Sequence, residues 1–245
     1  MLPDGVLVFG LGGAELLAIT AIMVLATLIQ MSIGIGLSLC MMPLLALVSP
    51  SLVPGPAALA AFAVMIAMVL GKTRLVVPSD IGWGSGGLLV GTAIGVAALF
   101  QIDPASLPRV FGVLILVAVA LSLSGLRLSA RPRDIAGASV LSGIMGGMSG
   151  IHGPLIGLVY ARESPARVRA TLGLYWMVAY ALLIVMHVGS GRLAAVDLAR
   201  ALVLLPGIGI GVLLAPQVAA RVDGRRMRIG LYVIAVVSAL ALLAR

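Results

Sequence analysis

The sequence predicts an all-α, polytopic membrane protein with eight apolar segments arranged as two inverted repeats. Three observations predict this: the composition, two segments broken by glycine, and an uneven distribution of basic residues among the loops. Of 245 residues, 62% are hydrophobic and 10% are charged, whereas a soluble domain has about 45–50% apolar and about 25% charged residues. Together with a mean hydropathy of +1.24, this excludes a soluble enzyme, a disordered chain and a secreted disulfide scaffold.

Eight apolar segments follow one another along the chain, rich in alanine, leucine and valine without the alternation of barrel strands. Their approximate bounds are 14–48, 57–71, 81–100, 107–124, 135–160, 168–187, 197–215 and 227–244. The single cysteine, Cys40, excludes an internal disulfide and is expected to be a small buried residue.

Two of these segments do not read as simple helices. A continuous helix over 14–48 would be about 52 Å long at ~1.5 Å per residue, whereas the hydrocarbon core of a bilayer is about 30 Å thick. Glycines interrupt this segment at residues 32–36, and glycines with a proline interrupt 135–160 at residues 146–154. Because glycine costs helix stability by roughly 1 kcal/mol and proline by about 3 kcal/mol, each segment is predicted to be a broken helix.

The distribution of basic residues among the loops discriminates between two membrane topologies. If every segment crosses the membrane once, the 16 basic residues divide equally between the two faces. If the two broken segments are hairpins, twelve of them share one face, in the loops 72–80, 125–134, 161–169 and 216–228. The positive-inside rule therefore favours two hairpins and six full spans, with both termini outside. The same rule explains the basic charge without a nucleic-acid partner.

The two halves of the chain also repeat at an offset of 116 residues. The matching pairs are Gly34 with Gly150, Gly91 with Gly207, and Arg109 with Arg225. We expect a first repeat over residues 1–125 and a second over 126–245, each a broken-helix hairpin followed by three transmembrane helices. Three crossings per half invert the second repeat, which is the arrangement of many secondary transporters.

Each break begins a second half-helix, whose N-terminus offers free N–H groups and the positive end of a helix dipole. Two such ends approaching from opposite faces would form a pocket for a small anion. The simpler interpretation, that the glycines only allow close helix packing, is favoured for Gly91 with Gly95 and for Gly207 with Gly211. The candidate binding residues are Gln30, Ser32, Gly34, Gly36, Ser38, Ser149, Gly150, His152, Gly153, Arg169 and Tyr175.

The sequence leaves the roles of His152 and Arg169 open and gives one expectation for His187. His152 lies inside the second break, where it would pair with an anion, carry a coupled proton, or only cap the broken helix. Arg169 would steer an anion into the pocket or anchor the helix at the cytoplasmic face. His187, near the outer end of its span, is expected at the membrane interface. No metal ligands, cofactor or catalytic residues are predicted.

Three sequence stretches resemble the sulfite exporter TauE/SafE family: QMSIGIG at residues 30–36, SGIMGGMSGIHGP at 142–154 and RATLGLY at 169–175. The resemblance covers nearly the whole chain. It implies export of a small sulfur-containing or organic anion, such as sulfite, sulfoacetate or sulfolactate, across the bacterial inner membrane. The first break lacks the fuller glycine run of the family and His152 replaces a glycine, so the substrate need not be sulfite.

Two other functions are weighed against a carrier. A passive anion channel would use the same pocket. A rhomboid-like intramembrane serine protease would use Ser149, within a Gly-x-Ser-Gly pattern, together with His187, but no supporting His and Asn precede them. The expected partners are the small anion and membrane lipid, and a homodimer is left open.

Overall fold

The computed structural model describes residues 10–70, 76–126, 128–160 and 165–244, and their regular elements are helices. Two short 3-10 helices, η1 (Pro50–Leu52) and η3 (Pro104–Ser106), join longer elements. The ten α-helices in these ranges are α1 (Gly13–Ile33), α2 (Leu37–Val48), α3 (Gly55–Val69), α4 (Pro78–Leu99), α5 (Leu107–Leu123), α6 (Pro132–Ser149), α7 (Gly153–Val159), α8 (Pro165–Gly189), α9 (Ala195–Arg221) and α10 (Gly224–Leu243).

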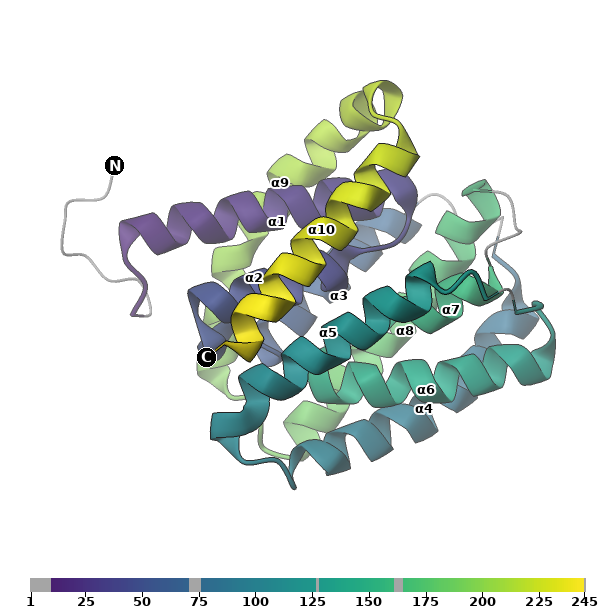
Figure 1. The fold of residues 1–245 in the computed structure, drawn as a ribbon, viewed down its shortest axis with the longest axis horizontal. Helices are drawn as coiled ribbons and strands as arrows, with labels where there is room; N and C mark the ends of the chain where they lie inside the picture. The colour runs from purple at the N-terminus through teal and green to yellow at the C-terminus, as the bar shows by residue number, and fades with distance from the viewer. Residues whose placement is uncertain (1–9, 71–75, 127, 161–164, 245) are drawn as a thin grey trace.

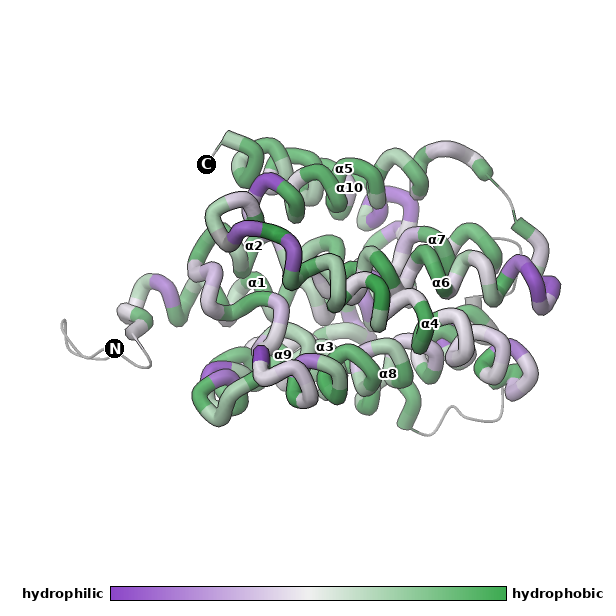
Figure 2. Tube along the Cα trace, turned by 90° about the horizontal axis from the view of Figure 1, so that it is seen from below, coloured by the Kyte–Doolittle hydropathy of each residue, from purple (hydrophilic) through white to green (hydrophobic). Residues whose placement is uncertain are grey.

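Five of the described helices are long and apolar enough to cross a membrane: α1, α4, α8, α9 and α10. The chain is therefore a multi-pass membrane protein, and Figure 2 shows its strongly hydrophilic positions mostly at turns and helix ends. The sequence assigns α1 to a hairpin arm, yet its 21 residues reach about 31 Å by themselves. Conversely, α3 and α5, expected as full spans, have only 15 and 17 residues.

The two predicted breaks are confirmed. In the first, α1 ends at Ile33 and α2 begins at Leu37, and Gly34 and Gly36 between them have φ of 81° and 118°. In the second, α6 ends at Ser149 and the next residue, Gly150, has φ of 75°. These left-handed conformations are readily adopted only by glycine. After each break the chain turns back, so that α2 packs on α1 and α7 packs on α6 (Figure 1).

The helices of the two predicted halves are interleaved. The first helix of each half packs along the fourth helix of the other, so α1 lies against α9 and α6 lies against α4. The equivalent helices α3 and α8 also contact each other, as do α5 and α10. The two hairpins lie between the α5–α10 pair and the α3–α8 pair (Figure 2).

Glycines bring these interleaved helices close together. A Cβ atom on Gly91 of α4 would overlap the carbonyl of Val140 on α6. A Cβ on Gly207 of α9 would lie 2.6 Å from the carbonyl oxygen of Thr20 on α1. Small residues allow this close approach of helices in lipid, so the packing interpretation of these glycines is confirmed.

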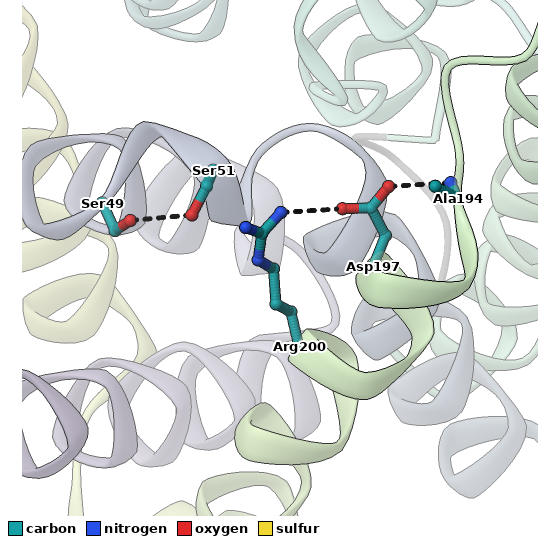
Figure 3. Close-up of polar contacts among 5 residues, drawn as sticks. All are labelled: Ser49, Ser51, Ala194, Asp197 and Arg200. Atoms are coloured by element: carbon teal, nitrogen blue, oxygen red, sulfur yellow. Dashed lines mark hydrogen bonds and ion pairs between the residues drawn. The ribbon is translucent and has the colours of Figure 1, made fainter. Parts of the chain in front are cut away.

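The described arginines lie mostly at one end of the molecule. Successive helices alternate in direction, so the turns that begin α6, α8 and α10 share one end, on the right in Figure 1. Seven arginines whose side chains the structure describes are at that end: Arg131, Arg133, Arg169, Arg221, Arg225, Arg226 and Arg228. Three are at the other end, Arg109, Arg192 and Arg200, and Arg200 pairs there with Asp197 (3.2 Å; Figure 3). This is the grouping that the hairpin topology requires.

Replacing Gly91 with alanine should destabilise the protein, because the added methyl group has no space beside the Val140 carbonyl. Overpacking of this kind costs about 1–3 kcal/mol. The loss is measured as a lower unfolding temperature in detergent. Gly86→Ala on the same helix is the control, because nothing lies within 4 Å of its Cβ position. Equal stability of the two variants would show that the α4–α6 contact is not tight.

Candidate functional site

A cavity of about 300 Å³ lies where the two breaks meet. Gly36 and Ser38 from the start of α2 line it, together with Gly153 and Pro154 from the start of α7. We call this space the hairpin cavity. Residues from three further helices also line it: Ser122 of α5, Val168 of α8, and Arg228, Leu231 and Tyr232 of α10.

The two breaks also touch each other directly. Ile35 packs on α7, where its Cδ1 atom lies 3.3 Å from the position of a Cβ on Gly157. Gly150 faces the end of the Met42 side chain on α2, and a Cβ at this position would overlap it. The glycines therefore let one hairpin approach the other without a side chain between them.

Gln30 closes the first break with both ends of its amide. Its Nε2 donates to the carbonyl of Gly34 (3.1 Å), and its Oε1 accepts from the N–H of Leu37 (3.0 Å). The first intrahelical bond of α2 runs from Cys40 N to Gly36 O. The N–H groups of Gly36, Ser38 and Leu39 precede that bond and have no place in the helical pattern, and all three residues line the hairpin cavity.

A much smaller inner pocket, of about 10 Å³, adjoins the hairpin cavity through Gly36, Ser38 and Gly153. Such a volume holds about one water molecule. Trp176 and Tyr180 of α8 line it, as does Gln30. The indole N–H of Trp176 is buried and has no hydrogen-bond partner among the described residues. Because this group can only donate, it would be satisfied by an acceptor such as an anion.

His152 is fully buried at the second break. Its carbonyl accepts a hydrogen bond from the Ser142 hydroxyl, and its ring packs against Gly146. The ring also meets Tyr180 edge-on, with centroids 5.0 Å apart. It lines neither the hairpin cavity nor the inner pocket. His152 contacts Tyr180, and Tyr180 in turn lines the inner pocket.

The other predicted residues lie around these spaces rather than in them. Arg169 reaches the first break, where its Cγ lies 2.8 Å from the position of a Cβ on Gly34. The Tyr175 hydroxyl donates to Ser139 of α6 (3.1 Å). The Ser149 hydroxyl donates to the carbonyl of Met145 (2.8 Å), and the buried hydroxyl of Ser32 has no partner in the described structure.

Several residues of the site are not among those predicted from the sequence. Arg228 and Tyr232 of α10 line the hairpin cavity, and Trp176 and Tyr180 of α8 line the inner pocket. Each pair is spaced by four residues, which places its members on one helix face. That spacing is the signal that could have been used. Arg228 belongs to the run RRMR at residues 225–228. The positive-inside rule already explains basic residues at this position, so the sequence offered no reason to assign Arg228 to a binding site.

The arrangement needed by a serine protease is not observed. The Nδ1 atom of His187 bonds to the carbonyl of Leu183 (3.0 Å), while Ser149 bonds to Met145. No hydrogen bond joins Ser149 to His187 in the described ranges. His187 lies in the last turn of α8, near the end of its span as expected, and its side chain is buried within the protein (2% exposed). The described residues also include no cluster of three metal-ligating side chains.

Residues 19–242 match the family described as Sulfite exporter TauE/SafE. The chain belongs to this family. The resemblance of the broken segments is thereby confirmed, and TauE/SafE proteins are membrane transporters for the export of sulfite and related anions. No curated protein and no solved structure matches the chain.

Replacing Gln30 with methionine should destabilise the protein, because Gly34 O and Leu37 N both lose their partner. Leaving buried polar groups unpaired costs about 1–3 kcal/mol for each group. The measurement is unfolding by a denaturing detergent. Thr20→Ala is the control, since this hydroxyl bonds only to Leu16 O within α1. If Gln30→Met unfolds like Thr20→Ala, the amide does not hold the break together.

Proposed function

We propose that this TauE/SafE protein is a secondary transporter that binds a small anion between the two hairpins and exports it across the bacterial inner membrane. One observation carries the proposal: the first turn of α2, with N–H groups outside the helical pattern, opens into the hairpin cavity beside Arg228. An anion placed there would accept from these N–H groups and from the hydroxyl of Ser38. Backbone donors at a helix start are a common anion site.

The charges around the hairpin cavity favour an anion over a cation. Among its described lining residues, Arg228 is charged and no carboxylate is present. The positive dipole end of α2 adds roughly half an elementary charge. The nearby carboxylate of Asp80 does not line the cavity, and it accepts a hydrogen bond from the Tyr160 hydroxyl (2.7 Å).

The lining of the cavity supports a sulfur oxyanion or a small organic anion. Polar groups come from Ser38, Ser122 and Arg228, and apolar surface comes from Ile35, Leu158 and Leu231. A sulfonate or carboxylate with a short carbon chain, such as sulfoacetate or sulfolactate, would use both kinds of group. Sulfite would use the polar groups alone.

Alternating access accounts for the difference in size between the two spaces. The hairpin cavity lies at the arginine-rich end of the molecule, which the positive-inside rule assigns to the cytoplasm. The inner pocket behind it is closed down to about 10 Å³. In our proposal the two inverted repeats, 1–125 and 126–245, rock against each other and open this pocket to the other side. The interleaved pairs α1–α9 and α4–α6 support such a repeat, because they are equivalent under the 116-residue offset.

His152 is the group that would couple transport to protons. It is buried at the second break and touches Tyr180, which lines the inner pocket. A histidine at this depth in a membrane is a candidate for proton transfer. A proton bound there would add positive charge near the anion.

Arg228→Gln should reduce anion efflux about tenfold, the effect of losing ~1.4 kcal/mol of attraction. Efflux of sulfite and of sulfoacetate is measured from loaded proteoliposomes. Arg226→Gln is the control, because Arg226 is exposed on the same first turns of α10 and does not line the cavity. Equal efflux of both variants would refute the site. Counterflow of labelled anion identifies a carrier, whereas its absence with preserved flux identifies a channel.

Cysteines at the two ends of the molecule should label from opposite sides of the membrane. Cys40, the only native cysteine, is fully buried and should remain unlabelled. In intact cells a membrane-impermeant maleimide should label Ser51→Cys, and it should label Arg226→Cys only after permeabilisation. Labelling of both from outside would contradict the proposed topology.

A further inference from the structure

A second cavity, of about 380 Å³, lies at the opposite ends of the helices that form the hairpin cavity. Along α5, the hairpin cavity touches Ser122 and the second cavity touches Pro108, a separation of about 21 Å at ~1.5 Å per residue. Along α8, the corresponding residues are Val168 and His187. We call this space the far cavity. It shares no residue with the hairpin cavity.

His187 lines the far cavity, and one of its ring nitrogens is buried without a partner among the described residues. Its side chain is buried, and Nδ1 lies 3.0 Å from the carbonyl of Leu183. Because a carbonyl oxygen only accepts, Nδ1 carries the proton and Nε2 carries the lone pair. Nε2 is buried without a partner among the described residues. An unpaired buried polar atom is unfavourable, so this nitrogen indicates a ligand that donates a hydrogen bond.

Arg192 is held beside His187 by the turn that ends α8. The N–H groups of Arg192 and Leu193 both donate to the carbonyl of His187 (2.9 and 3.1 Å). The guanidinium lies over the ring of Phe100, 4.2 Å from its centroid, and donates one bond to Leu99 O (3.5 Å). A guanidinium has five N–H donors, which leaves donors for an anion in the cavity that Arg192 lines.

The remaining wall is apolar and contains the starts of two helices. Pro54 precedes α3, and Leu107 and Pro108 begin α5, so both positive dipole ends are at the cavity. Phe111 and Leu242 contribute large apolar surfaces. No carboxylate is among the described residues that line the cavity.

We propose that the far cavity binds an amphipathic anion that carries a hydroxyl group next to its charged head. The head binds Arg192, the hydroxyl donates to His187 Nε2, and the apolar tail packs against Phe111 and Leu242. A free hydroxy acid and a lipid with a phosphate and glycerol hydroxyls, such as phosphatidylglycerol, share this chemistry. The test of this site does not depend on the proposed transport. It measures equilibrium binding to a cavity that shares no residue with the hairpin cavity.

The test uses the full-length protein labelled with ¹⁵N-histidine in an uncharged detergent. The chain has two histidines, and the ring signals lost in His187→Gln identify that residue. Titration with 2-hydroxyhexanoate should shift the His187 Nε2 resonance to saturation. Hexanoate, which lacks the hydroxyl, and 1,2-hexanediol, which lacks the charge, should each bind at least about tenfold more weakly. A shift confined to His152, or equal binding of the diol, would overturn the proposal.

Variants separate the site from general apolar partitioning. Arg192→Gln should weaken binding of 2-hydroxyhexanoate about tenfold, the loss of ~1.4 kcal/mol of attraction. Arg200→Gln is the matched control, because Arg200 pairs with Asp197 on the adjoining α9 (Figure 3) and does not line the cavity. Ala105→Trp, which adds a large ring at the cavity wall and keeps both polar groups, should weaken binding at least about tenfold even if Arg192→Gln fails to fold. Unchanged binding in either folded variant would refute the site.

The source of the ligand is decided by competition. If phosphatidylglycerol displaces 2-hydroxyhexanoate from delipidated protein and phosphatidylcholine does not, the occupant is a lipid. If neither lipid displaces the acid, the occupant is a soluble hydroxy acid. Displacement by both lipids to the same extent would show that the head group is not recognised, which contradicts the proposal.

Discussion

The centre of this protein depends on how the backbone groups freed by two helix breaks are paired. In hydrocarbon an unsatisfied N–H or C=O costs several kcal/mol, so a broken helix survives only with substitutes. Gln30 supplies a donor and an acceptor from one side chain, and Ser142 supplies a hydroxyl to the His152 carbonyl. Both residues come from the first arm of their own hairpin. Each break is therefore closed locally, and the first turn of α2, whose residues Gly36, Ser38 and Leu39 line the hairpin cavity, keeps N–H groups outside the helical pattern.

The two cavities are polar for different reasons. In the hairpin cavity the proposed hydrogen-bond donors are backbone N–H groups at the start of α2, together with the side chain of Arg228. Backbone donors have a fixed direction and suit a compact head group. The far cavity draws on the side chains of His187 and Arg192 within an otherwise apolar wall. That combination suits a ligand with a tail, because apolar surface supplies affinity and a few polar groups supply orientation.

The sequence predicted the structure at positions where a residue has a single physical role, as the glycines of the breaks do. The breaks were located because Gly34, Gly36 and Gly150 can adopt conformations that other residues cannot, and the α4–α6 contact because small residues permit it. Arg228 was missed because an arginine at a cytoplasmic helix end satisfies the topology rule whether or not it binds a ligand. The burial of His187 was not predicted, because it depends on residues distant in sequence that line the far cavity with it, such as Leu99 and Phe111.

The interleaving of α1 with α9 and of α4 with α6 has a consequence for biosynthesis. The glycine-lined face of α4 has no helix to pack on until α6 has been synthesised. The face of α1 that packs on α9 stays uncovered until α9 has been synthesised. Neither half can bury its own close-packed surface, so the N-terminal half must stay in the membrane as a loose intermediate while the ribosome completes the chain. The same contacts link the evolution of the two halves, because a larger residue in place of a glycine on α4 requires a compensating substitution on α6 in the second half.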